Sequence, residues 1–195
     1  MENSKKLHIM VEGAIMVALA TGLSMIKLIT LPWGGSVTLL SMLPIVIFSI
    51  RRGFVKGLMT AFVYSVMQLL LGITVDGLLG WSLTPLALFG CIMFDYLLPF
   101  TVLGLAGVFG KNSTLRMVGG VILALSLRFV MHYISGVLIF HSFGELWEGF
   151  STDNTFLYSL LYNGFYMLPE IIFTAAATAV LCSISQTRKL VLLKK

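Results

Sequence analysis

Residues 156–184 read FLYSLLYNGFYMLPEIIFTAAATAVLCSI, an apolar run that contains one acidic side chain, Glu170, and no basic one. A helix needs about 20 residues to cross the hydrocarbon core of a bilayer, and this run is longer. A membrane-spanning strand would alternate apolar and polar side chains, and this run does not alternate. The stretch therefore predicts a transmembrane helix, and a membrane protein becomes the first hypothesis for the whole chain.

The rest of the sequence supports this hypothesis. Apolar residues make up 58% of the chain and charged residues 11%, against roughly 45–50% and about 25% in soluble domains. Soluble globular and disordered proteins are thereby excluded. We predict an all-α integral membrane protein, a single domain over residues 1–195 with six transmembrane helices. The predicted spans are 9–26, 37–50, 57–75, 82–109, 117–140 and 156–184.

The connections between the spans are short. The longest, residues 141–155, has no room for a nucleotide-binding domain, so an ATP-driven role would need an ATPase on another chain. The chain contains no H-E-x-x-H and no G-x-S-x-G motif, and we expect neither an enzyme nor a cofactor or metal site. A stand-alone carrier and an intramembrane enzyme remain the alternatives from other functional classes.

Basic residues gather on one side of the predicted spans. The side that holds both termini carries every Lys and Arg except Lys27 and Arg128. The acidic residues of the opposite connections are Asp76, Glu145, Glu148 and Asp153. By the positive-inside rule, both termini are cytoplasmic. The net charge of +5 thus reflects membrane topology and does not indicate a nucleic-acid partner.

The second run, residues 37–50, is unusual because it is short. At 1.5 Å per residue it covers roughly 20 Å of the ~30 Å core. The turn-rich residues 31–36 (LPWGGS) precede it. We expect this loop to dip into the membrane from outside and complete the crossing, which is tolerated where protein or a cavity surrounds the backbone. A tilted span with a surface loop is the alternative.

Three charged residues fall inside predicted spans: Asp95, Arg128 and Glu170. Each costs about 2.5–3.5 kcal/mol at the centre of a span, so each needs a partner or a cavity. We expect Arg128 to pair with one carboxylate and the other carboxylate to face a cavity. A purely structural bridge between Arg128 and a carboxylate would explain one acid and leave the second unexplained.

Helical spacing groups the polar residues further. Arg128, His132 and Phe140 recur at intervals of four and eight on one face, and Asn163, Tyr166 and Glu170 share a face of the last span. Because these faces also carry aromatic side chains in the outer half, we predict a binding cavity there. Interfacial aromatic belts, which need no ligand, are the alternative explanation for any single Tyr or Trp.

Several short segments occur in the order typical of one known family. They are 12–16 (EGAIM), 34–38 (GGSVT), 41–44 (SMLP), 95–96 (DY), 103–107 (LGLAG), 132–136 (HYISG), 158–163 (YSLLYN) and 169–170 (PE). In this order they resemble the thiamine-specific substrate-capture subunits, or S components, of energy-coupling factor (ECF) transporters. The resemblance implies a bacterial plasma-membrane protein with a vitamin-sized pocket that opens outward. It also implies partners: a transmembrane coupling subunit and two cytoplasmic ATPase subunits.

The resemblance further implies residue roles. The residues expected to bind thiamine are Trp33, Asp95, Tyr96, His132, Phe140, Tyr158 and Asn163, where Phe140 replaces the family's usual tryptophan. Secondary ligand-binding or structural residues are Arg128, Tyr162, Tyr166 and Glu170. On the first span, Ala14 and Ala18 match an alanine-x-x-x-alanine face that contacts the coupling subunit.

Thiamine carries a permanent positive charge on one ring and an aminopyrimidine as the other. Asp95 is the expected carboxylate partner of the cation, with His132, Tyr158 and Asn163 near the pyrimidine. Glu170 lies deeper, and we expect Arg128 to pair with it. Replacement of Glu170 should therefore affect folding more than the affinity for thiamine. S components for riboflavin or biotin are the alternatives within the fold, although biotin is an anion.

Overall fold

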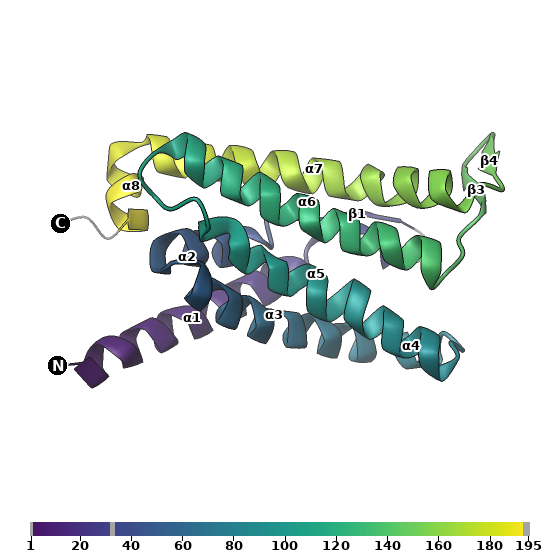
Figure 1. Ribbon diagram of the computed structural model, residues 1–195, viewed down its shortest axis with the longest axis horizontal. Coiled ribbons are helices and arrows are strands. Elements are labelled where there is room, and N and C mark those ends of the chain that lie inside the picture. The colour runs from purple at the N-terminus through teal and green to yellow at the C-terminus, as the bar shows by residue number, and fades with distance from the viewer. Residues whose placement is uncertain (1, 32–33, 193–195) are drawn as a thin grey trace.

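The computed structural model describes residues 2–31 and 34–192, most of which are helical. Figure 1 shows an elongated bundle, with α8 and the start of α1 at one end and the β3–β4 hairpin at the other. We call these the inner end and the outer end. The longest helices are α1 (Glu2–Ser24), α3 (Phe54–Thr74), α6 (Thr114–Leu138) and α7 (Thr155–Ser183). The shorter helices are α2 (Leu43–Arg52), α4 (Pro85–Cys91), α5 (Leu98–Thr101) and α8 (Ser185–Leu192), and the strands are β1 (Lys27–Thr30), β2 (Ser36–Thr38), β3 (Gly144–Trp147) and β4 (Phe150–Thr152).

Five helices of the described chain are long and apolar enough to cross a membrane. They are Asn3–Ser24, Phe54–Thr74, Pro85–Gly107, Thr114–Leu138 and Thr155–Ser183. Each coincides with a predicted span to within a few residues at most ends, and the prediction of an all-α membrane protein is confirmed. The basic residues near the ends of α2, α6 and α8 lie at the inner end, together with the start of α1 (Figure 1).

The helix Pro85–Gly107 is continuous but irregular. After α4, residues Ile92–Leu97 form a wide π-helical turn, followed by α5 and a tight 3-10 segment, Val102–Gly107. Pro99 has no N–H to donate to the carbonyl of Asp95, four residues earlier, which removes one α-helical hydrogen bond at this point. Wide turns of this kind occur frequently at functional sites. Here the wide turn contains Asp95 and Tyr96.

The second predicted span, residues 37–50, is wrong as a continuous helix. Val37 and Thr38 belong to strand β2, a turn follows, and helix α2 begins at Leu43 and has 10 residues. Pro44 lies in the first turn of α2, where proline is favoured because its missing N–H needs no partner. The Thr38 N–H donates to the side chain of Glu170, which holds β2 against α7.

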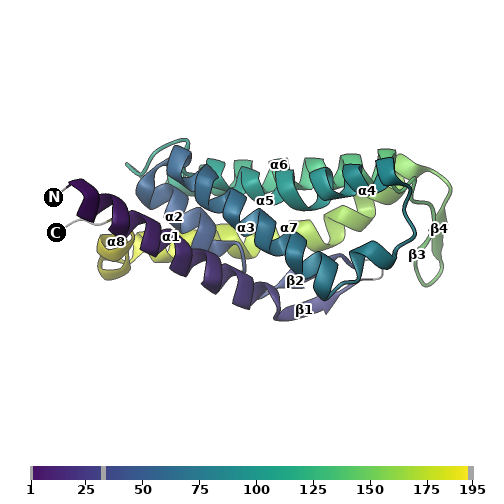
Figure 2. The same cartoon turned by 90° about the horizontal axis from the view of Figure 1, so that it is seen from below.

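In place of an irregular loop, the chain forms a short antiparallel hairpin. Lys27 pairs with Thr38 and Thr30 with Ser36, and Figure 2 shows β1 and β2 beyond the end of α1, along one edge of the bundle. Two side chains of α7 hold the hairpin. The Gly35 N–H donates to the Tyr162 hydroxyl at 3.0 Å, and Thr38 donates to Glu170. The hairpin therefore forms a wall of the bundle.

The inner end is closely packed. Ser49 of α2 donates its hydroxyl to the carbonyl of Gly104 and accepts from the Gly107 N–H at 3.0 Å, so one small side chain of α2 binds two backbone groups of the helix Pro85–Gly107. A Cβ added at Gly120 would overlap the carbonyl oxygen of Ala106. The main buried apolar cluster also lies here and fixes α1, α2, α3 and α6 against one another.

Candidate functional site

A cavity of about 830 Å³ occupies the outer half of the bundle. Its walls come from the β1–β2 hairpin, α3, the helix Pro85–Gly107, α6 and α7. At the rim, Phe140 and Phe143 are 37% and 69% exposed, whereas Glu170 on the cavity wall is 2% exposed. The cavity thus extends from an exposed rim to a buried floor.

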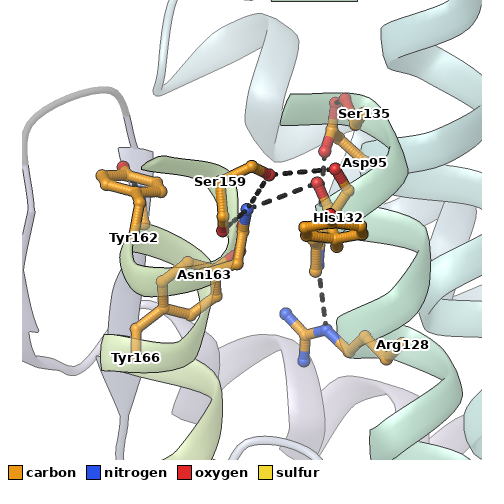
Figure 3. A network of polar contacts seen from close by, with 10 residues as sticks. Asp95, Arg128, His132, Ser135, Ser159, Tyr162, Asn163 and Tyr166 are labelled. Carbon is orange, nitrogen blue, oxygen red and sulfur yellow. Dashed lines mark hydrogen bonds and ion pairs between the residues drawn. The ribbon is translucent and has the colours of Figure 1, made fainter. Parts of the chain in front are cut away.

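Asp95 is held by two side chains of α6. The Ser135 hydroxyl donates to one carboxylate oxygen, and the His132 Nδ1 lies 3.1 Å from the other. Figure 3 shows Asp95 beside both residues. Because Ser135 and His132 are buried, each of these hydrogen bonds is protected from exchange with bulk water. Asp95 is therefore an oriented carboxylate at the cavity wall.

Arg128 determines which nitrogen of His132 carries the proton. The Arg128 Nε–H can only donate, and it points to His132 Nε2 at 3.3 Å. His132 Nε2 is therefore the acceptor, and Nδ1–H donates to Asp95. In this arrangement the imidazole is neutral.

The guanidinium of Arg128 lies 4.1 Å from the centre of the Phe100 ring and also donates to the sulfur of Met42. Among the described residues, no ion pair joins Arg128 to Asp95 or Glu170. The expectation that Arg128 pairs with Glu170 is wrong. A π face and an imidazole lone pair take the place of the carboxylate as partners of the guanidinium.

Asn163 is bonded within the protein. Its amide donates to the Ser159 carbonyl at 2.9 Å and to the Ser159 hydroxyl at 3.1 Å, and its oxygen accepts from the Tyr166 hydroxyl at 2.7 Å. A longer contact of 3.4 Å reaches the carbonyl of His132 on α6 (Figure 3). Asn163 thus joins α6 to α7 and fixes the wall that carries His132.

Aromatic rings form two parts of the wall. Tyr158 and Tyr162 stack with their centres 6.1 Å apart and their planes at 16°, and Tyr166 meets Tyr162 edge-on. At the rim, Trp81 and Phe140 are 6.3 Å apart at 61°. Flat aromatic surfaces therefore flank the polar group of Asp95 and His132.

The structure places most of the predicted site residues on this one cavity. Those that line it are Asp95, Tyr96, Arg128, His132, Phe140, Tyr158, Tyr162, Asn163, Tyr166 and Glu170. Trp33 lies outside the described residues. Ala14 and Ala18 are exposed on α1, away from the cavity.

Sequence reasoning missed several lining residues. Trp81 is an aromatic residue in a connection at the outer end, the same signal that pointed to Trp33, and could have been found in that way. Ser159 lines the cavity, and Ser135 is not among the lining residues but bonds Asp95; both are small hydroxyl residues that carry no distinctive spacing. The Lys27–Asp76 ion pair at 3.0 Å joins β1 to the end of α3 across the rim, and its two residues are 49 positions apart.

The charge of the cavity is unbalanced. Its described lining holds two basic side chains and three carboxylates. These are Lys27, Arg128, Asp76, Asp95 and Glu170. With all five ionised and the histidines neutral, one negative charge is left over. A cavity with aromatic walls and one surplus negative charge suits a flat organic monocation.

Comparisons with known proteins agree with this chemistry. A family model described as "Thiamine transporter protein (Thia_YuaJ)" matches residues 10–190. A protein described as "Thiamine transporter ThiT" from Bacillus subtilis is 30% identical over 96% of this chain and 95% of its own length. One of the same description from Lacticaseibacillus paracasei is 28% identical over 95% and 92%. A solved structure of ThiT from Listeria monocytogenes has a TM-score of 0.71 at 26% identity, covering 93% of this chain and 97% of its own.

Proposed function

The chain belongs to the family of thiamine transporter proteins, which are membrane transport proteins rather than enzymes, and from this premise we propose that it is the substrate-binding S component of an ECF-type ABC importer. In this role it captures thiamine from outside the cell with high affinity. A coupling module driven by separate ATPases then delivers the vitamin to the inside. The proposed topology has six crossings with both termini cytoplasmic, α2 and the β1–β2 hairpin together making the second.

The excess of carboxylates over basic side chains in the described cavity lining, three against two, is the observation that carries this proposal. Thiamine is a monocation, so it complements this excess, and Asp95 is already oriented by Ser135 and His132. A neutral or anionic vitamin would leave the charge uncompensated or add to it. Biotin, which is an anion, is therefore disfavoured as the substrate.

The walls supply the remaining contacts. A cation against a desolvated aromatic face contributes about 2 kcal/mol, and a hydrogen bond to a charged group contributes about 1.5–3 kcal/mol. Two or three such contacts, with burial of both rings, are consistent with nanomolar affinity, about −12 kcal/mol. We assign Asp95 to the cation and the tyrosines of α7, with Tyr96 and Phe140, to its aromatic surroundings.

Asn163 has a different role in this proposal from the one the family resemblance implies. Its amide nitrogen and oxygen already have partners within the protein. Direct recognition of the pyrimidine by Asn163 would require these bonds to open. We therefore propose that Asn163 orients Tyr166 and the backbone of His132.

The test is a calorimetric titration of detergent-purified protein with thiamine. We expect Asp95→Asn to weaken binding at least tenfold, about 1.4 kcal/mol. The matched control is Asp153→Asn, which removes the same charge at an exposed position outside the cavity lining and should change affinity less than threefold. The absence of thiamine binding by the wild type, or equal affinity in the wild type and Asp95→Asn, would contradict the proposal. Riboflavin and biotin, titrated in parallel, test the sibling functions.

The coupling partner is proposed to dock on α1. Ala14 and Ala18 are exposed and lie one turn apart, and Ala18 and Gly22 line a shallow groove with neighbouring apolar side chains. Small residues at this spacing let a second helix approach closely in lipid. The short connections leave the ATPases to other chains.

A further inference from the structure

Glu170, on the floor of the cavity, has one carboxylate oxygen engaged and one free. The engaged oxygen, Oε1, accepts from the Thr38 N–H at 2.6 Å and from the Thr38 hydroxyl at 2.7 Å. The other oxygen, Oε2, is buried and has no hydrogen-bond partner among the described residues. Glu170 as a whole is 2% exposed and lines the cavity.

A buried carboxylate oxygen without a partner costs free energy, and such groups in native proteins call for an explanation. Arg128 does not provide one: its Nε–H and one Nη–H donate to His132 and Met42, and among the described residues none of its donors bonds Glu170. Thr38 does not either, since both of its donors point to Oε1. In the described structure the free oxygen therefore has no donor.

Asp95 and Glu170, two of the three carboxylates that line the cavity, lie at different depths. Asp95 is level with His132, whose carbonyl meets the amide of Asn163. Glu170 follows Asn163 by seven residues on α7, about 10 Å along the helix axis. A ligand with its positive charge at one end and an uncharged donor at the other can satisfy both carboxylates together.

We propose that Glu170 Oε2 is a second subsite, which accepts a hydrogen bond from an uncharged N–H or O–H group of the ligand while Asp95 faces the cation. The proposal rests on the proposed function, because thiamine has this division of groups. Its cationic ring is separate from two neutral donors, the amino group of the pyrimidine and the hydroxyl of the side chain. The shared chemistry is a neutral donor, and the experiment distinguishes between the two.

Glu170→Gln is a sharp probe because Thr38 fixes the orientation of the new amide. The Thr38 N–H must meet an acceptor, so the amide oxygen takes the place of Oε1 and the amide NH₂ takes the place of Oε2. The variant thus offers a donor where the wild type offers an acceptor. If Glu170 had a purely structural role, its replacement would not change whether the protein prefers a ligand with a hydrogen-bond donor or one with an acceptor at this position.

The experiment measures affinities of three ligands for the wild type and Glu170→Gln. The ligands are thiamine, the analogue with oxygen in place of the pyrimidine amino group, and the analogue with a methoxy group in place of the hydroxyl. If the amino group points to Glu170, thiamine binds at least tenfold more weakly to Glu170→Gln, and the variant prefers the oxo analogue to thiamine. If the hydroxyl does, the methoxy analogue, which accepts but cannot donate, binds at least tenfold more weakly than thiamine to the wild type and about as tightly as thiamine to the variant.

The matched control is Thr174→Val. Thr174, one turn further along α7, also has a buried hydroxyl without a hydrogen-bond partner among the described residues, but it does not line the cavity, so this variant should keep all three affinities within twofold. If Glu170→Gln weakens the binding of all three ligands equally, or leaves the ratios of their affinities unchanged, the subsite is overturned. The proposed function, thiamine binding by the wild type, is not affected by that result. Should the variant not fold, the wild type alone decides: binding both analogues as tightly as thiamine would overturn the subsite. A wild type that binds no thiamine would instead refute the proposed function itself, and the subsite with it.

Discussion

Helices α6 and α7 lie side by side along the bundle, yet the space beside them is used differently at its two ends. At the inner end, small residues bring backbones into contact, and a hydroxyl such as that of Ser49 is bonded on both sides within the protein. At the outer end, the same helices stand around a cavity of about 830 Å³, and Glu170 reaches it with an oxygen that has no hydrogen-bond partner among the described residues. The inner end is thus filled by packed backbone and side chains, whereas the outer end encloses space lined by polar and aromatic side chains.

The difference shows how one bundle can be both rigid and receptive. Close packing at the inner end fixes the axes of the helices, so the side chains around the cavity keep their positions without filling it. The ion pairs of Glu12 with Arg51, at 2.9 Å, and with Arg52 add to this by joining α1 to α2. Binding and transport should therefore be separable by mutation.

The largest expected effect comes from a change that touches neither the cavity nor the packed core. We predict that Ala14→Trp combined with Ala18→Trp abolishes thiamine uptake by cells, because the bulky rings keep the coupling subunit away from α1. Affinity of the isolated protein should stay within twofold. The control is Leu168→Trp with Ile172→Trp, an exposed pair at the same spacing on α7, which should transport normally. Loss of binding in the α1 variant would show that this face packs internally.

Next in size is a test of the close packing itself. Gly120→Ala places a methyl group against the Ala106 carbonyl, and overpacking of this kind costs roughly 1–3 kcal/mol. Gly164→Ala, near the cavity on α7, meets nothing within 4 Å and should be neutral or slightly stabilising. Thermal unfolding of both variants without ligand measures the contrast. Equal stability of the two variants would contradict the division into a packed and a hollow half.

The smallest expected effect concerns the rim. Phe140→Trp enlarges the aromatic face near Trp81, and because tryptophan is the best cation–π partner, we expect thiamine affinity to rise about threefold, less than 1 kcal/mol. The unfolding temperature should not change, since Phe140 is 37% exposed. A decrease in affinity would indicate that the rim excludes larger rings and does not stack on the ligand.

Hydropathy alone predicted five of the helices, because crossing a bilayer leaves few alternatives to a long apolar run. It failed at residues 37–50, where apolar character was shared by strand β2 and the short helix α2. The contact of β2 with α7, between Thr38 and Glu170, joins residues 132 positions apart, so no pattern in the neighbouring sequence indicates it.

The roles of the predicted site residues stay a prediction, but their positions can be compared with the structure. The sequence analysis expected one carboxylate to pair with Arg128 and the other to face a cavity, whereas Asp95, Arg128 and Glu170 all line one cavity. Their partners could not be derived from the sequence. The preference of Arg128 for Phe100 and His132 depends on distances between helices that the spacing along one helix does not contain.

The wide turn at Ile92–Leu97 has a consequence for how the length of this helix can vary in evolution. A π-helical turn holds one residue more than an α-helical turn, so it can arise or disappear through a single insertion or deletion. Removal of that one residue would convert the wide turn into an ordinary α-helical turn, so the helix on either side of it would keep the face it now presents. Only the residues of the turn itself would change direction, and Asp95 would then no longer face His132 and Ser135. Single-residue length changes at this point are therefore a route by which Asp95 could be exchanged for another side chain while the packed inner half stays intact.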